Sequence, residues 1–211
     1  MSKRIFGLLV LAGFFLLPVS AKADSVAWEY TSTVTSLTTP PNNATVAVVF
    51  TPTANIWVDY LGYFDNGGIK DANGHLVGLY NSSGVLIAST NITSSSSILT
   101  TNFVFNSITP VELLAGSNYV LEGVSGTTDQ YTNQTLGLNS YLPISIDGYN
   151  YQFNGGNLIY DNTVAPAAGS IPIQFFGADF GGFATPEPSS LLLLGSGLAG
   201  LAGLIKRKLM I

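Results

Sequence analysis

The fold of this 211-residue chain is decided by the stretch HLVGLYNSSGVLIA, residues 75–88. Two apolar runs, residues 75–80 and 85–88, flank four polar residues that end in Gly84. A polar link of this length is typical of a hairpin turn, because glycine adopts a positive φ without steric cost. The stretch therefore predicts a β-hairpin.

The same pattern extends in both directions from this hairpin. Short apolar runs alternate with clusters of Gly, Asn, Asp and Ser, and no ten-residue stretch of residues 24–183 shows a helical stripe. Many short strands at roughly even spacing predict an all-β fold, an antiparallel β-sandwich or jelly roll. The predicted strands are residues 45–50, 56–64, 75–80, 85–91, 98–105, 117–123, 136–138, 149–153, 158–161 and 171–176.

The N-terminus has the three parts of a secretory signal peptide. Lys3 and Arg4 precede an apolar run over residues 5–17, and Ala21 and Ala23 form a small-x-small cleavage pattern. The apolar run is shorter than the roughly 20 residues of a spanning helix, which disfavours the alternative of an uncleaved anchor. We therefore expect residues 1–23 to be removed.

The C-terminus has a different three-part order. A Pro186-Glu187-Pro188 triplet precedes an apolar run over residues 191–205, and the basic residues Lys206, Arg207 and Lys208 follow it. Basic residues beside an apolar span stay on the cytoplasmic side, so the tail predicts a single transmembrane helix with its end inside. At about 1.5 Å per residue the run spans roughly 23 Å, less than the hydrocarbon core of about 30 Å, which favours a temporary hold.

This tail resembles the PEP-CTERM sorting signal, through Pro186, Glu187 and Pro188, the apolar run and the terminal basic cluster. The resemblance implies a Gram-negative bacterium and processing by an exosortase, a membrane-embedded cysteine transpeptidase. It also implies release or attachment at the cell surface, and a link with exopolysaccharide and biofilm. An ordinary single-pass anchor behind a Pro-rich linker is the alternative. The expected organisation is a signal peptide (1–23), a β-sandwich domain (24–183) and a sorting tail (184–211).

A second resemblance concerns the domain itself. Residues 74–80, 83–88 and 114–120 are similar to an uncharacterised β-sandwich domain that recurs in extracellular bacterial proteins, often in front of this sorting tail. The resemblance implies a fold and no known activity.

The charge of residues 24–183 excludes one class of partner. This range has eleven acidic residues and a single basic one, Lys70, for a net charge of −10. Binding to nucleic acid depends on neutralising phosphates with Lys and Arg, so nucleic acid is excluded as a partner. The chain has no cysteine, which excludes disulfides, thiolate nucleophiles and cysteine metal sites.

Residues that could support catalysis are sparse. His75 is the only histidine and no G-x-S-x-G motif is present, so we expect His75 to open a strand and make a local hydrogen bond. Paired carboxylates could hydrolyse glycosides, yet no spacing brings two of the available ones together. We therefore expect no enzymatic activity. The available carboxylates are Asp59, Asp65, Glu112, Glu122 and Asp147.

Two weak ligand sites remain. Asp65 and Asp71 lie in a Gly-rich polar loop whose oxygens could hold Ca²⁺, although turn chemistry explains the same residues. Tyr149 and Tyr151 lie near Asn and Gln side chains and could bind a sugar, although alternation between core and surface explains them too.

Three functions follow from these observations. The first is an exported, non-enzymatic surface or matrix protein with a structural or adhesive role, whose partners are the exosortase, the membrane and the exopolysaccharide. The second is a carbohydrate-binding module that recognises exopolysaccharide. The third is a hydrolase, which requires two carboxylates facing one cleft.

Overall fold

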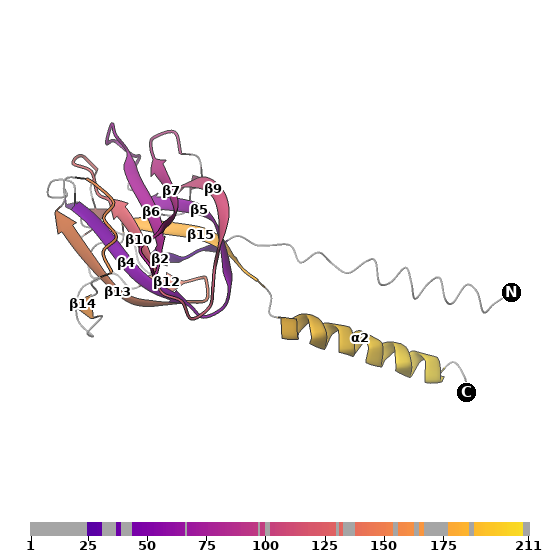
Figure 1. The fold of residues 1–211 in the computed structure, drawn as a ribbon. Helices are drawn as coiled ribbons and strands as arrows, with labels where there is room; N and C mark the ends of the chain where they lie inside the picture. The colour runs from indigo at the N-terminus through magenta and orange to yellow at the C-terminus, as the bar shows by residue number, and fades with distance from the viewer. Residues whose placement is uncertain are drawn as a thin grey trace.

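The computed structural model describes residues 25–30, 37–38, 44–65, 67–96, 98–99, 102–129, 131–132, 138–153, 156–162, 165–166, 177–185 and 188–208. Most of these residues are strands, and one helix follows them (Figure 1). The strands are β1 Ser25–Val26, β2 Trp28–Tyr30, β3 Leu37–Thr38, β4 Ala44–Pro52, β5 Ile56–Phe64, β6 His75–Asn81, β7 Leu86–Ile92, β8 Ile98–Leu99, β9 Phe103–Leu113, β10 Tyr119–Val124, β11 Tyr131–Thr132, β12 Leu138–Ser140, β13 Ile144–Phe153, β14 Ala165–Pro166 and β15 Ala178–Ala184.

The strands form two main antiparallel sheets, as the sequence predicts. The five-stranded sheet has the order β1-β15-β5-β9-β8, and the six-stranded sheet has the order β14-β13-β4-β10-β6-β7. Two further pairs, β11 with β3 and β12 with β2, are also antiparallel. The chain is therefore mostly β with antiparallel pairing.

One hydrophobic core lies between the two main sheets. It contains Phe50 of the six-stranded sheet and Leu61 and Phe180 of the five-stranded sheet, all with no exposed surface. The Phe50 and Phe180 rings stack with centroids 5.0 Å apart, and Trp28 meets Phe180 edge-on at 5.7 Å. Two sheets that share one core are the arrangement expected of a β-sandwich. The finer jelly-roll assignment stays a prediction.

The predicted hairpin is confirmed as β6 and β7. Asn81 begins the turn, and its side-chain oxygen accepts hydrogen bonds from the N–H groups of Ser83 and Val85, both at 3.0 Å. Gly84 has a φ of 77°, the left-handed conformation for which glycine is favoured. The register shifts between Leu79 and Tyr80, a bulge that adjusts the pairing beside the turn.

Other predicted strands agree with the structure to differing degrees. The predicted strands at 45–50, 56–64 and 117–123 are confirmed as β4, β5 and β10. The predicted strand at 149–153 is confirmed within β13, which begins earlier, at Ile144. The single strand predicted at 98–105 is wrong, because β8 and the eleven-residue β9 occupy this region as separate strands.

The sequence pattern does not predict strand β15, because two consecutive glycines such as Gly181 and Gly182 are typical of a turn. Gly182 has a different reason to be glycine, since a Cβ there would collide with the backbone oxygen of Trp57 on β5. The pairing of β15 with β5 shifts register between Gly181 and Gly182, so the glycines permit close approach at a bulge.

The strand predicted at 158–161 is wrong. These residues lie outside every strand, and Tyr160 has a φ of 53°, which no strand residue adopts. The predicted strand at 171–176 lies outside the described residues. Of the strand predicted at 136–138, only Leu138 is described, and it begins β12.

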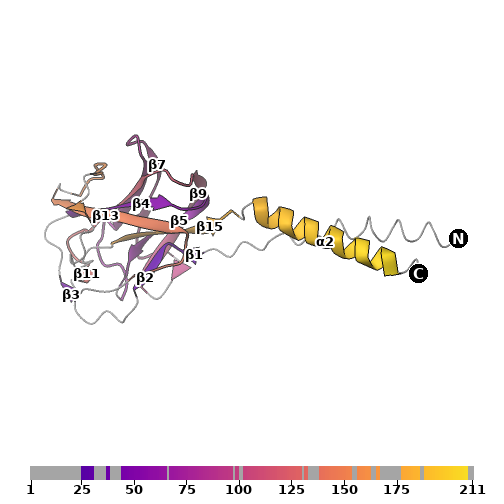
Figure 2. The same ribbon diagram turned by 90° about the horizontal axis from the view of Figure 1, so that it is seen from below.

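The helix α2 Pro188–Lys208 contains the predicted span over residues 191–205. It extends away from the sheets in both views (Figures 1 and 2), and Leu194, Leu198, Leu201 and Ile205 are each 50–57% exposed. Among the described residues, no helix combines the length and the apolar character needed to cross a membrane. The predicted signal peptide, with Lys3, Arg4, Ala21 and Ala23, lies outside the described residues.

The β domain has two ends that matter for function. We call the end where α2 leaves the tail end: β4 finishes there at Pro52, and the Thr185 N–H donates to the Asn55 carbonyl at 3.0 Å. We call the opposite end the distal end: β4 begins there at Ala44, whose carbonyl accepts the Ser125 N–H at 2.8 Å. The six residues of β10 run from the tail end to the distal end.

Candidate functional site

The sorting tail begins where the β domain finishes. Ala184, the last residue of β15, pairs with Ile56, and both the N–H and the hydroxyl of Thr185 donate to the Asn55 carbonyl, at 3.0 and 3.2 Å. Pro186 and Glu187 lie outside the described residues, and Pro188 begins α2. Only two residues therefore separate the last residue bonded to the domain from the helix.

The residues at both ends of α2 are ones that stabilise helix ends. Proline is favoured in the first helical turn, because its missing N–H has no partner to lose there. Lys206, Arg207 and Lys208 occupy the last turn, where the helix dipole favours positive charge. The predicted basic cluster is therefore also a favourable helix end.

His75 lies at the centre of a buried polar cluster at the distal end. Its ring is fully buried, with Nδ1 2.9 Å from the Val124 carbonyl oxygen and Nε2 2.9 Å from Asp129 Oδ2. The ring stacks on Tyr63 of the facing sheet, with centroids 3.9 Å apart and planes 4° from parallel. Burial raises the pKa of Tyr63, so its phenol stays neutral.

The expectation for His75 is half right. It opens β6 as predicted, but its hydrogen bonds are not local, because the partners lie 49 and 54 residues further along the chain. The sequence offers no signal for Asp129, which stands in a polar stretch between β10 and β11. Antiparallel pairing of β6 with β10 brings the two regions together.

The partners of His75 use both of its ring nitrogens. The Val124 carbonyl can only accept a hydrogen bond, so Nδ1 carries a proton. Asp129 also accepts hydrogen bonds from the backbone N–H groups of Lys70 and Asp71, at 2.8–2.9 Å. The contact of 2.9 Å between Nε2 and Asp129 Oδ2 requires one proton between these two atoms. Both ring nitrogens are occupied.

Asp71 ties two loops together beside this cluster. Its carboxylate accepts the N–H of Asn73 at 3.0 Å and the N–H of Thr127 at 2.8 Å. Burial raises the pKa of Asp71, but the hydrogen bonds from Thr127 and Asn73 and the nearby His75 outweigh it, so the net shift is downward. Asp71 is therefore ionised.

The two calcium candidates are not neighbours in any hydrogen-bond network. The Asp65 carboxylate accepts the Gly68 N–H of its own turn at 2.5 Å, whereas the Asp71 carboxylate accepts the N–H groups of Asn73 and Thr127. In the described ranges, no group of three or more His, Asp or Glu side chains is placed to hold a metal ion. Calcium binding stays a prediction, which thermal unfolding with and without calcium tests.

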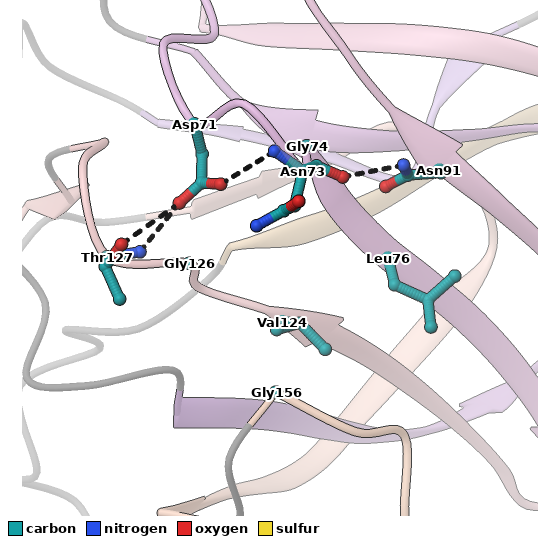
Figure 3. A pocket seen from close by; sticks show the side chains of 9 residues that line it. All are labelled: Asp71, Asn73, Gly74, Leu76, Asn91, Val124, Gly126, Thr127 and Gly156. Carbon is teal, nitrogen blue, oxygen red and sulfur yellow. Dashed lines mark hydrogen bonds between the residues drawn. The ribbon is translucent and has the colours of Figure 1, made fainter.

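A pocket of about 440 Å³ opens next to Asp71 at the distal end (Figure 3). We call it the distal pocket. Figure 3 shows Asp71 turned toward Thr127 and the Asn73 backbone, with Leu76 and Val124 on another part of the wall. The lining residues come from four segments of the chain: Asp71, Asn73, Gly74, Leu76, Asn91, Val124, Gly126, Thr127 and Gly156.

The segment after Gly156 crosses the outer face of the six-stranded sheet. We call residues 157–161 the strap. Both carboxylate oxygens of Glu122 hold it, since Oε2 accepts the Ile159 N–H at 2.9 Å and Oε1 accepts the Asp161 N–H at 2.6 Å. Leu158 and Tyr160 pack on a small outer cluster around Ala47, Val49, Tyr80 and Val120.

Glu122 is therefore a structural residue. Its side chain is fully buried, and burial raises its pKa, although the N–H groups of Asp161 and Ile159 oppose this. These N–H bonds explain why 158–161 cannot pair as a strand, because the donors are already used. Asp161 in turn accepts from the amides of Asn150 and Gln152 on β13.

The other candidate carboxylates serve separate contacts. Asp147 accepts the Thr51 hydroxyl at 2.6 Å, and Glu112 accepts the Asn55 amide at 3.3 Å, both near the tail end. Asp59 lies within β5. Hydrolysis by a carboxylate pair would need two of them across one cleft. Among the carboxylates that the structure describes, Asp71 alone lines the distal pocket.

The predicted sugar-binding tyrosines lie on β13. Tyr149 pairs with Val48 and Tyr151 with Val46 on β4. Directly paired residues share a face, and Val48 belongs to the core, so Tyr149 lies on the core-facing side of the sheet. Tyr149 is half-buried, and burial raises its pKa. Sugar binding through these tyrosines stays a prediction.

Comparison with known proteins identifies the tail. The family described as the PEP-CTERM protein-sorting motif matches residues 184–208, from the end of β15 to the basic end of α2. No curated protein and no solved structure matches the chain. The motif is that of an exported protein targeted to an exosortase. Residues 184–208 of this chain are thus a PEP-CTERM protein-sorting motif.

Proposed function

We propose that this chain is an exported, non-enzymatic protein of the cell surface or extracellular matrix, with a structural or adhesive role in an exopolysaccharide or biofilm. Its tail holds the β domain at the inner membrane until an exosortase processes it. The observation that carries this proposal is the sorting motif at residues 184–208, directly behind an acidic β domain.

The chemistry of the triplet supports processing at this position. Each proline fixes φ and lacks an N–H donor, and the residue before a proline is pushed toward extended geometry. The prolines at 186 and 188 therefore favour extended geometry at the residues before them, Thr185 and Glu187, which a protease-like cleft can accept. Glu187 supplies a single charge for such a cleft to recognise.

Substitution of Glu187 tests the proposal. We expect Glu187→Ala to leave the protein unprocessed and membrane-bound in its native host, as measured by mass spectrometry of the C-terminus and by cell fractionation. Glu112→Ala, an exposed glutamate of the β domain, is the matched control and should be processed normally. Normal processing of Glu187→Ala would contradict the role of the motif.

The non-enzymatic part of the proposal has its own support. Both ring nitrogens of His75 are engaged in a buried cluster, so the ring is not free to act as a base. Glu122 holds the strap, and Asp147 and Glu112 bond to neighbouring polar side chains.

Carbohydrate recognition is the second candidate function. It is favoured by a specific observation, the distal pocket, whose wall combines carboxylate, amide, hydroxyl and backbone groups with apolar side chains. A glycan array probed with the full chain tests it, and saturable binding to a neutral polysaccharide is the expected result.

A further inference from the structure

We infer that the distal pocket is a binding site for a segment of uncharged polysaccharide. This inference rests on the second candidate function, carbohydrate recognition, and assigns it a site other than Tyr149 and Tyr151. At about 440 Å³ the pocket is within the range of small-ligand sites, roughly 300–1,000 Å³. That volume suits one or two sugar rings.

The chemistry of the wall suits a sugar. Hydroxyl groups both donate and accept hydrogen bonds, and the wall offers the Asp71 carboxylate and the amides of Asn73 and Asn91. The Asn73 side chain is exposed, and in the described part of the chain it has no hydrogen-bond partner, so its amide is free for a ligand. Leu76 and Val124 add an apolar surface for the C–H face of a ring.

Charge selects against acidic ligands. Asp71 is ionised because its hydrogen bonds and the nearby His75 lower its pKa, and residues 24–183 have a net charge of −10. Lys70 is the only basic residue of that range. Uronate, sulfate and phosphate groups would be repelled at this wall, whereas a neutral polysaccharide carries no such penalty.

The pocket is held in shape before any ligand binds. The His75–Asp129 pair fixes the backbone of Lys70 and Asp71, and Asp71 fixes Thr127. The Asn91 amide donates to the Asn73 carbonyl at 2.8 Å, which joins β7 to the same wall (Figure 3). A wall that is already ordered loses little conformational entropy on binding.

Glycine keeps the pocket open. Gly126 has a φ of 67°, and a Cβ there would collide with the Asp71 carboxylate. Gly74 has a φ of 69°, and a Cβ there would collide with the Ile92 carbonyl. Gly156, with a φ of 90°, brings the start of the strap to the same wall. Because these glycines have no side chain, they take up none of the pocket volume.

The pocket lies at the distal end, away from the sorting tail. Val124 at the end of β10 and Leu76 at the start of β6 line it, whereas Tyr119 and Asn81 at the other ends of these strands lie toward the tail end. A chain held by its tail therefore presents the pocket away from its point of attachment, toward the matrix.

The test is a titration of the full-length, ¹⁵N-labelled chain in detergent micelles. The probes are cellohexaose, mannohexaose and xylohexaose, with oligogalacturonate as the acidic control. We expect at least one neutral probe to shift the Gly74, Gly126 and Gly156 amides and the Asn73 side-chain amide saturably. Asn73→Ala should weaken that binding about three- to tenfold, the loss of one hydrogen bond.

Matched variants separate the possible outcomes. Asn118→Ala, an exposed asparagine toward the tail end, should bind like the unmodified chain. Tighter binding of oligogalacturonate, no saturable shift with any neutral probe, or shifts confined to Tyr149 and Tyr151 would each overturn the site. Asn73→Ala should still be processed at its tail, so loss of sugar binding and failure of sorting are distinguishable.

Discussion

At the scale of single residues, His75 shows how a lone histidine can be structural. Its ring is buried between Tyr63 and the loops at the distal end, and both nitrogens make hydrogen bonds, one with Val124 and one with Asp129. A buried polar group that loses its hydrogen-bond partner costs stability, so His75 and Asp129 depend on each other. Asp129 is the more sensitive residue, because it also accepts two backbone N–H groups.

Substitution of Asp129 measures this dependence. We expect Asp129→Ala to lower the free energy of unfolding by about 3–5 kcal/mol, because His75 and two backbone N–H groups lose their acceptor and each unsatisfied buried group costs roughly 1–3 kcal/mol. Asp129→Asn keeps an acceptor oxygen and should lose less. Urea denaturation is the measurement, with Asp65→Ala as a control in the Gly68 turn. A control as unstable as Asp129→Ala would refute the special role of the pair.

At the scale of elements, the strap depends on one side chain. Residues 157–161 are not part of any strand. Instead, the two carboxylate oxygens of Glu122 accept the N–H groups of Ile159 and Asp161. Gly78 permits this packing, because a Cβ there would crowd Leu158. The strap covers the outer cluster, and its preceding residue, Gly156, lines the distal pocket.

Removal of the carboxylate should release the strap. In Glu122→Ala we expect the Ile159 and Asp161 amides to exchange with solvent at least tenfold faster, and stability to fall by about 1–3 kcal/mol, since buried donors are left unpaired. Hydrogen exchange measured by NMR checks this. Glu122→Gln, which keeps one acceptor oxygen, should expose one of the two amides. Unchanged protection in Glu122→Ala would mean that apolar packing alone holds the strap.

At the scale of the whole molecule, the domain and the sorting motif are close neighbours. The domain bonds the chain as far as Thr185, and α2 begins at Pro188. At about 3.5 Å per residue, the intervening residues allow a separation of only about 10 Å. An enzyme that binds the triplet must therefore lie directly beside the tail end of the β domain.

Lengthening this junction tests the effect. We expect a ten-residue Gly-Ser insertion between Thr185 and Pro186 to speed processing several-fold in the native host, because the triplet then stands clear of the domain. Pulse-chase labelling with mass spectrometry of the product measures the rate. The same insertion after Gly116, in the turn before β10, is the control. Slower processing of the junction variant would mean that the enzyme also uses the domain surface.

Local pattern predicts much of this protein. Alternation and turn residues predict β4, β5, β10 and the β6–β7 hairpin, because these strands alternate around short turns. The same rule misses β15, whose glycines serve close packing, and wrongly assigns a strand to the strap, whose N–H groups bond to Glu122. Both errors arise because the deciding contact is distant in the chain.

The sequence by itself determined the class of fold and the sorting tail, because alternation, turn chemistry and a contiguous motif are local properties. Only the tertiary structure decided that His75 meets Asp129 and that Asp71, Asn73, Asn91 and Gly156 share one pocket. The physical reason is that antiparallel pairing brings together loops dozens of residues apart, and no local pattern records which loops will meet.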